Sequence, residues 1–262
     1  MATAQTSPAG GAAAPGEVAR FDALAAQWWD PRGPMAPLHA MNPLRVGWIA
    51  ARLQGPGLPG PGLPGLVPPG PVPPGPVRLL DVGCGAGLAA EALARLGHDV
   101  LGIDAAGQAL EAGRAHAEGQ GLPLAYRQAT TTDLVREGQR FAAVTALEVI
   151  EHVPDPAGFL RDLACLLEPG GRLFVSTLNR TARALLVAKL GAEYVLRLLP
   201  VGTHDWRRFI TPAELAREAR AGGLRMTATA GMSFDPLRRQ WRESRDLAVN
   251  YIAAFELAAP RE

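Results

Sequence analysis

Short apolar runs alternate with amphipathic segments from Arg78 to the end of the chain. The runs have the length and the branched side chains of buried strands, and they lie at 78–82, 99–103, 124–128, 141–147, 171–177, 224–231 and 247–256. Apolar residues recur at helical spacing between them, near 88–97, 107–119, 156–168 and 211–222. This alternation predicts an α/β fold with a seven-stranded, mostly parallel sheet and helices on both faces. No helix separates the last two strands, which allows the final strand to run antiparallel.

The pattern of residues 17–53 predicts an N-terminal helical segment, the lid (residues 17–53). Glu17 to Asp30 has an amphipathic pattern, and the Asn42-Pro43 pair indicates the start of a second helix, because asparagine caps a helix and proline fits its first position. One face of the first helix gathers its apolar residues, Phe21, Leu24, Ala25 and Trp28.

Two further segments lack this periodicity. Residues 1–16 are rich in Ala, Gly, Pro and Ser, and we expect a disordered tail. Residues 54–77 hold ten prolines and seven glycines, a composition that favours an extended polyproline-like linker. We interpret the linker as a tolerated loop expansion, with a ligand for a proline-recognition domain as the alternative. The remaining residues, 78–262, form the predicted main domain.

Composition narrows the partners and the compartment. The 262 residues carry 26 basic and 25 acidic side chains, so the net charge of +1 gives no basic field to attract nucleic acid. Only Cys84 and Cys165 are present, and a disulfide at Cys84 would distort a glycine-rich turn, which favours a reducing compartment. The first residues lack the pattern of a signal peptide, and no apolar stretch reaches about 18 residues. We therefore expect a cytoplasmic location.

A glycine-rich turn carries the strongest chemical signal. Gly83-Cys84-Gly85-Ala86-Gly87 follows the strand 78–82, and ligands of open α/β sheets bind at such strand ends. Asp104 ends the next strand, where its carboxylate can accept hydrogen bonds from both hydroxyls of a ribose. Leu88 occupies the position at which a dinucleotide fingerprint has its last glycine or alanine, which argues against a nicotinamide or flavin site. The alternative is a nucleotide-like fold whose site is empty or degenerate.

Six sequence blocks carry a family resemblance. They are WWD (28–30), PLHAMNPLRVGWI (37–49), LLDVGCGAG (79–87), LEVIEHVPDP (147–156), LEPGGRLFVSTLNR (167–180) and GAEYVLRLLPVGTHDWRRFITPAEL (191–215). On these blocks the chain, from Phe21 to about Tyr251, resembles the ubiquinone-biosynthesis O-methyltransferases, which methylate polyprenylated phenols and demethylubiquinol. The resemblance implies a Rossmann-like class I methyltransferase fold and S-adenosylmethionine as methyl donor. The glycine turn and the PGG segment are general to class I, whereas the first two blocks and the last are specific to the family.

The resemblance also assigns cofactor contacts to Arg45, Gly83, Asp104 and Leu147. An arginine offers two parallel donors to the cofactor carboxylate, and Gly83 lets the backbone approach the methionine part. Leu147 ends the fourth strand and would lie beside the sulfonium. Without the family block around it, Arg45 would be interpreted as an ordinary surface charge.

The segment Glu148 to His152 carries the candidate catalytic chemistry. A phenol has a pKa near 10, so a base or a Lewis acid should help to form the phenolate at neutral pH, and His152 is the candidate base. Alternatively, Glu148, Glu151 and His152 could hold Mg²⁺ or Zn²⁺, as some relatives are thought to do. A third possibility is a structural loop with His152 bonded to backbone. His204 and Asp205 form a secondary candidate pair.

The predicted insertion 178–208 bears on the substrate. Within 181–201, charged residues recur at every fourth position (Lys189, Glu193, Arg197) in an otherwise apolar sequence. We interpret this helix as a cover that dips into an anionic membrane surface at the inner face of the membrane and admits a polyprenyl tail; a helix buried against the sheet is the alternative. Four arginines around Trp241 could contact acidic headgroups or simply face solvent.

Two other functions remain open at this point. One is a class I methyltransferase for another small phenolic acceptor. The other is a non-catalytic, cofactor-binding scaffold of a quinone-biosynthesis complex, although Asp104 and the turn glycines are intact.

Overall fold

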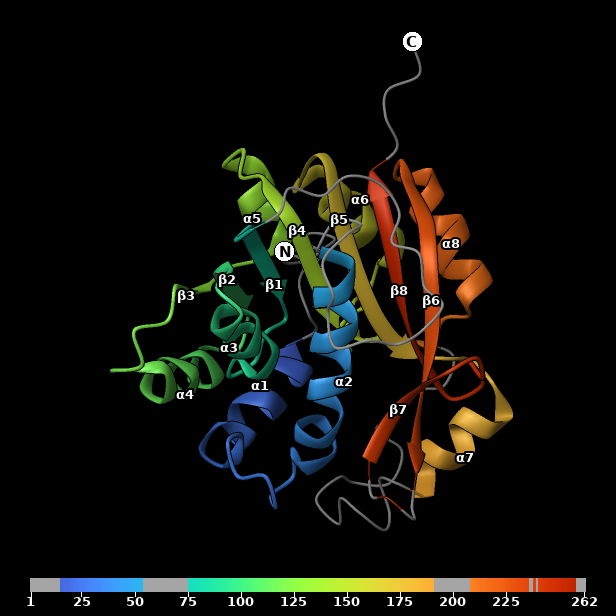
Figure 1. Cartoon of the computed structure of the whole chain (residues 1–262), viewed down its shortest axis with the longest axis horizontal. Coiled ribbons are helices and arrows are strands. Elements are labelled where there is room, and N and C mark those ends of the chain that lie inside the picture. The colour runs from blue at the N-terminus through green and yellow to red at the C-terminus, as the bar shows by residue number, and fades with distance from the viewer. Residues whose placement is uncertain (1–14, 54–74, 191–207, 236–237, 239, 258–262) are drawn as a thin grey trace, which may run out of the picture.

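The computed structural model describes residues 15–53, 75–190, 208–235, 238 and 240–257 (Figure 1). Its sheet has eight strands in the order β3-β2-β1-β4-β5-β8-β6-β7. The strands are β1 (Arg78–Val82), β2 (Asp99–Asp104), β3 (Leu124–Gln128), β4 (Phe141–Leu147), β5 (Leu167–Leu178), β6 (Leu224–Asp235), β7 (Gln240–Ser244) and β8 (Asn250–Leu257). The predicted α/β class is confirmed.

The pairing of the strands is parallel in the first half of the sheet and mixed in the second. β3, β2, β1, β4 and β5 pair in parallel, whereas β8 runs antiparallel to both β5 and β6. The expected reversal of the final strand is thus confirmed, but the predicted count of seven is wrong. The additional strand, β7, pairs with the end of β6 at the sheet edge. It was missed because Gln240 to Ser244 contains a single apolar residue, Trp241.

Helices cover both faces of this sheet, as predicted. They are α1 (Pro15–Leu24), α2 (Ala36–Leu53), α3 (Leu88–Arg95), α4 (Gly107–Ala117), α5 (Thr131–Arg136), α6 (Pro156–Cys165), α7 (Ala182–Leu190) and α8 (Pro212–Ala221), with short 3-10 turns η1 (Ala25–Gln27) and η2 (Ile150–His152). Successive strand residues point to opposite faces, so Leu79 belongs to the core cluster that includes residues of α2 and α3, while Leu80 belongs to the cluster that includes residues of α6 and α8. In Figure 1, α2 lies across the front of the sheet.

The helices of the lid differ from those expected. The second helix begins at Ala36, not at Asn42, and Pro43 lies inside it on an exposed face. Asn42 is buried, and its side-chain amide donates to the carbonyl oxygen of Leu88 at 2.7 Å, which ties the lid to α3 instead of capping a helix. The first helix ends at Leu24, not at Asp30, and continues as η1.

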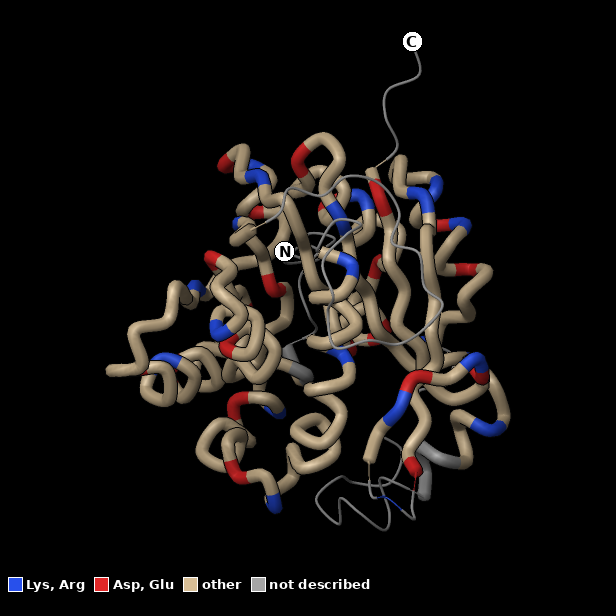
Figure 2. The backbone as a smooth tube through the Cα atoms, in the orientation of Figure 1, with Lys and Arg blue, Asp and Glu red and all other residues tan. Residues whose placement is uncertain are grey.

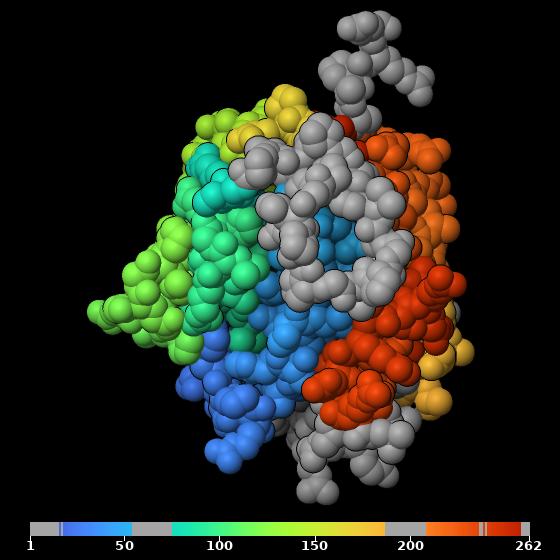
Figure 3. Space-filling view, in the orientation of Figure 1, coloured from blue at the N-terminus to red at the C-terminus, as the bar shows by residue number. Residues whose placement is uncertain are grey.

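The lid is anchored on α4. The Asp22 carboxylate accepts from the backbone N–H of Gln108 at 2.8 Å, in the first turn of α4, where a negative charge is favourable. The ring of Trp29 stacks on His116 with a centroid distance of 3.5 Å and an interplanar angle of 4°. Figure 3 shows the lid surface, in blue, between the green α3–α4 region and the orange-red hairpin of β6 and β7.

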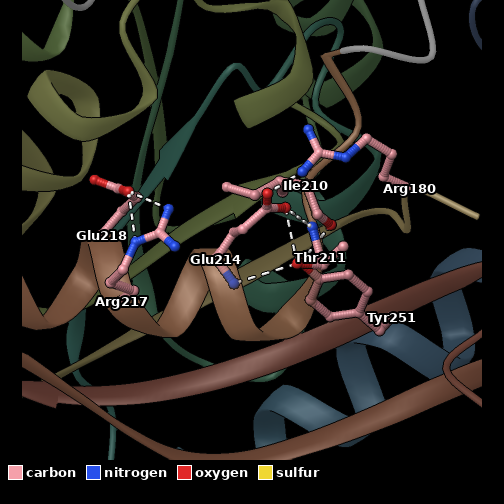
Figure 4. Close-up of polar contacts among 7 residues, drawn as sticks. All are labelled: Arg180, Ile210, Thr211, Glu214, Arg217, Glu218 and Tyr251. Carbon is pink, nitrogen blue, oxygen red and sulfur yellow. Dashed lines mark hydrogen bonds and ion pairs between the residues drawn. The ribbon is translucent and has the colours of Figure 1, made fainter.

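Positions of basic and of acidic residues are both spread along the backbone of the described elements (Figure 2). One ion pair of opposite charges links the end of β5 to α8, close to where the predicted insertion begins (Figure 4). Arg180, just after β5, forms an ion pair with Glu214 of α8, and Glu214 also accepts from the backbone N–H of Thr211 at 2.9 Å. The hydroxyl of Tyr251 donates to the carbonyl oxygen of Ile210 at 2.9 Å.

Only the first part of the insertion lies within the described residues. α7 confirms the beginning of the predicted helix, whereas Glu193, Arg197, His204 and Asp205 lie outside the described residues. Among the described helices, none is both long and apolar enough to span a bilayer.

Candidate active site

A cavity of about 320 Å³ lies at the carboxyl ends of β1, β2 and β4, where the lid covers the sheet. Its lining includes four of the predicted site residues, Gly83, Asp104, Leu147 and His152. The lid supplies much of the opposite wall, with Phe21 and Trp28 among its side chains. One candidate base and three candidate cofactor contacts therefore surround the same space.

The glycine turn brings bare backbone to this cavity. Gly83, Gly85 and Gly87 have φ angles of 66°, 55° and 89°, a left-handed conformation that favours glycine. The backbone N–H groups of Gly83 and Cys84 both donate to the carbonyl oxygen of Ile103, at 2.8 and 3.1 Å, which fixes the turn against β2. A Cβ atom on Gly85 would lie 2.1 Å from Cζ2 of Trp28. The lid thus packs directly on the turn.

This packing makes Gly85→Ala a sharp test. We expect a loss of about 3 kcal/mol in unfolding free energy, from left-handed strain and displacement of Trp28. Gly97→Ala is the matched control: Gly97 has φ 92°, but a Cβ there would meet nothing within 4 Å, so only strain of about 1 kcal/mol applies. Urea unfolding of both variants measures the difference. Equal losses would contradict the contact between the lid and the turn.

Asp104 is held ready to accept further hydrogen bonds. One carboxylate oxygen accepts from the N–H of Gly85 and the other from the N–H of Ala106, both at 2.8 Å. Burial raises the pKa of Asp104, and these backbone donors oppose that rise. Because a carboxylate has about four lone-pair positions, the two backbone bonds leave room for the hydroxyls of a ribose in the cavity. The geometry fits the adenosine part of S-adenosylmethionine.

Arg45 is not a surface charge, yet it does not line the cavity. Its side chain is 4% exposed, and one terminal nitrogen lies 3.8 Å from a carboxylate oxygen of Glu148, which does line the cavity. Burial lowers the pKa of Arg45, opposed by the negative charges of Glu148 and Asp81. The structure therefore places Arg45 behind Glu148, and its predicted contact with the cofactor carboxylate stays a prediction.

Asp81, two residues before Gly83, is a buried acid behind the glycine turn. It accepts a hydrogen bond from the hydroxyl of Thr145 at 2.6 Å, and burial raises its pKa to about 6, with Thr145 and Arg45 opposing. An acid with a raised folded pKa stabilises the fold below its ordinary pKa of 3.8, and this contribution is lost as pH rises through about 6.

Asp81→Asn should therefore flatten the pH dependence of stability. The contribution lost by the intact protein between about pH 4 and pH 6 is roughly 3 kcal/mol, at about 1.4 kcal/mol per pKa unit. Urea unfolding at pH 4 and pH 7 measures it, and any pH-independent cost of the substitution cancels in the comparison. Asp99→Asn, exposed at the start of β2, is the control. Parallel loss of stability in the Asp81 variant and the intact protein would contradict the assignment.

The segment after β4 is strained and polar. Glu148 has φ 59°, the one positive φ among the described non-glycine residues, and such strain persists where the surroundings hold it. Its carboxylate accepts from the hydroxyl of Ser176 at 2.7 Å, and Glu151 accepts from the hydroxyl of Thr177 at 2.9 Å. Glu151 is 5% exposed, and burial together with the charge of Glu148 raises its pKa well above the ordinary value.

These contacts bear on the alternatives for His152. No group of three or more His, Cys, Asp or Glu within the described ranges is arranged to hold a metal ion, so the geometry does not support the metal interpretation. His152, the last residue of η2, lines the cavity, and its ring meets Phe21 of the lid edge-on at a centroid distance of 5.9 Å. Sequence reasoning missed Ser176 and Thr177, which carry no signal beyond a buried strand.

The fold and the site together define a class I methyltransferase that depends on S-adenosylmethionine. A family profile described as "Methyltransferase domain" matches residues 52–229. The chain belongs to the ubiquinone biosynthesis O-methyltransferase family. Curated members include one from Azorhizobium caulinodans, 48% identical over 90% of this chain and 91% of its own, and one from Dinoroseobacter shibae, 46% identical over 91% and 94%.

Solved structures agree at the level of the fold. A possible histamine N-methyltransferase from Thermotoga maritima gives a TM-score of 0.59 at 16% identity, with 90% of this chain and 98% of that chain covered. The magnesium protoporphyrin IX methyltransferase from Synechocystis, with bound SAH, gives 0.56 at 18% identity, with coverage of 84% and 83%.

Proposed function

We propose that this chain transfers the methyl group of S-adenosylmethionine to a hydroxyl of polyprenyl catechols or demethylubiquinol. The observation that carries the proposal is the cavity in which Asp104, suited to a ribose, and His152, suited to a phenol, share one space under an apolar lid. Family membership supplies the acceptor class.

The residues around the cavity account for the chemistry as follows. His152 accepts the proton of the acceptor hydroxyl, and the resulting oxygen forms a bond to the methyl carbon as the bond from that carbon to sulfur breaks. In-line transfer needs alignment and exclusion of water more than covalent help from the protein. The lid, anchored by Asp22 and Trp29, supplies the exclusion.

The test uses the intact protein with labelled S-adenosylmethionine and a short-tailed demethylubiquinol. We expect label in the methoxy product, and a second incubation with EDTA addresses the metal alternative. Activity that EDTA removes and Mg²⁺ or Zn²⁺ restores would favour the metal interpretation for Glu148, Glu151 and His152. No transfer to any phenolic acceptor, with cofactor binding intact, would favour the scaffold of a quinone-biosynthesis complex.

The choice of acceptor distinguishes the proposed polyprenyl substrate from the alternative, in which the substrate is a small soluble phenol. A methyltransferase for soluble phenols should use a tail-less catechol at least as well as a tailed one. Preference for the tailed acceptor, measured as the ratio of kcat/KM, supports the quinone-pathway substrate.

We also propose that the insertion contacts the inner face of the membrane. On α7, the described part of segment 181–201, Leu186 is 58% exposed. Deletion of residues 183–199 should weaken sedimentation with anionic liposomes while a soluble catechol is still methylated. Equal sedimentation of the deletion variant and the intact protein would remove the membrane claim.

A further inference from the structure

We infer that the isoprenoid tail of the acceptor binds to the lid, along one face of α1 and the first turn of α2. This inference rests on the proposed function and names a subsite of the same cavity. Val18, Phe21 and Leu24 recur at every third position of α1, so they share one helix face, and all three line the cavity. Leu38, at the start of α2, lines it as well.

The exposure of these side chains distinguishes them from core residues. Val18, Phe21, Leu24 and Leu38 are half-buried, and they pack at the edge of a small cluster around Trp28 and Met35. Further along the same lid, Val46, Trp48 and Ile49 are buried in the core cluster that includes residues of the sheet. The lid thus completes a core with α2 but keeps apolar surface facing the cavity with α1, where a hydrocarbon can cover it.

The positions of the polar groups orient the acceptor. The cofactor side of the cavity holds Gly83, Gly85 and Asp104, at the ends of β1 and β2. His152 also lines the cavity, and its ring meets that of Phe21 edge-on at a centroid distance of 5.9 Å. An acceptor hydroxyl at His152 therefore brings its aromatic ring beside Phe21, and a chain on that ring meets the neighbouring side chains of the same helix face. Arg20 is the one charged residue that α1 adds to the cavity lining.

In this arrangement the lid, and not the predicted insertion 178–208, binds the tail inside the protein. Burial of each methylene group is worth about a fourfold gain in affinity, so a tail against this face should dominate the preference among acceptors. The insertion then serves at most to meet the membrane, a separate step from tail binding.

The experiment compares two acceptors, a tail-less catechol and the same catechol with a farnesyl chain. Leu38→Gln and Val18→Thr make the subsite polar, and Leu38→Met keeps it apolar. We expect Leu38→Gln to lower the ratio of kcat/KM, tailed over tail-less, by about tenfold, mostly through KM. Val18→Thr, which preserves shape, should lower the ratio in the same direction, and Leu38→Met should leave it within about twofold.

Two leucines outside the subsite provide controls. Leu96→Gln, at a 53% exposed position after α3, checks the substitution itself and should not change the ratio. Leu186→Gln, on α7, checks the insertion. If Leu186→Gln lowers the ratio of tailed to tail-less kcat/KM, and neither Leu38→Gln nor Val18→Thr lowers it, the tail subsite is not on the lid. If the intact protein methylates neither acceptor, the proposed function fails and this inference fails with it. If the intact protein methylates both acceptors, but Leu38→Gln and Val18→Thr leave the ratio unchanged, only the tail subsite is wrong.

Discussion

Asp104→Ala is expected to weaken binding of S-adenosylmethionine by about 100-fold or more. The substitution removes the acceptor for both ribose hydroxyls, and a hydrogen bond to a charged group is worth about 1.5–3 kcal/mol. Two such bonds at the lower limit amount to about 3 kcal/mol, which corresponds to roughly 150-fold in affinity. The backbone N–H groups of Gly85 and Ala106 also lose their partner, so the turn is less well positioned for the ligand. Calorimetric titration with the cofactor measures the change.

A matched variant separates this effect from general damage to β2. Asp99→Ala removes an exposed carboxylate at the other end of the same strand and should bind the cofactor as the intact protein does. Thermal unfolding of the Asp104 variant shows whether the sheet persists. A folded Asp104→Ala protein that binds with undiminished affinity would show that the ribose is held elsewhere, and the assignment of the cavity would be wrong.

Most of the sheet could be predicted because the strands are short, apolar and separated by helical patterns. β1 and β4 match their expected ranges, and the parallel pairing of the first five strands follows from the alternation with helices. The predictions failed where tertiary contacts outweigh local signals. Asn42 has the sequence context of a helix cap, but its side chain instead donates a hydrogen bond to the carbonyl oxygen of Leu88. The helix α2 starts before Asn42 and continues through Pro43.

The residues of the candidate site likewise include some that the sequence could predict and some that it could not. Gly83 and Asp104 could be placed because the ends of consecutive strands meet at one edge of the sheet, which spacing alone implies. Ser176 and Thr177 could not, because their partners lie 28 and 26 residues away and the choice depends on the register of β4 against β5. Arg45 was tied to the site by family resemblance, but its depth behind Glu148 depends on how α2 packs.

Burial of carboxylates around the cavity fits the charge of the ligand. Asp81, Asp104, Glu148 and Glu151 lie at or near the ends of β1, β2 and β4. The buried Arg45 forms an ion pair with Glu148 and also interacts electrostatically with Asp81. Removing carboxylates from water opposes their ionisation, which is why burial raises the pKa of Asp81, Asp104 and Glu151. A cationic sulfonium placed among these groups interacts favourably with each ionised carboxylate. The acids thus cost stability in the free protein, and if the cofactor binds here as proposed, those that are ionised would favour the charged methyl donor over its neutral product.

His152→Ala is expected to lower kcat by at least about 100-fold on a catechol, the usual range for loss of a general base. The base is needed because the hydroxyl must lose its proton before or during transfer. An acceptor that ionises near neutral pH, such as a nitrocatechol, does not need that help, so the loss should shrink toward a few-fold. Steady-state kinetics with the two acceptors, at fixed pH and saturating cofactor, measure the difference between the two losses.

His152→Gln tests the same role with the side-chain volume and a hydrogen-bonding group retained. If His152 acts as a base, glutamine cannot replace it, and the variant should resemble His152→Ala on the ordinary catechol. If His152 only shapes η2 and supports Phe21, glutamine should restore most of the activity. Losses that are equal for the ordinary and the acidic acceptor would mean that the imidazole positions the ring without taking its proton. The contrast between acceptors decides the role of His152 because a purely structural contact has no reason to depend on the acidity of the hydroxyl.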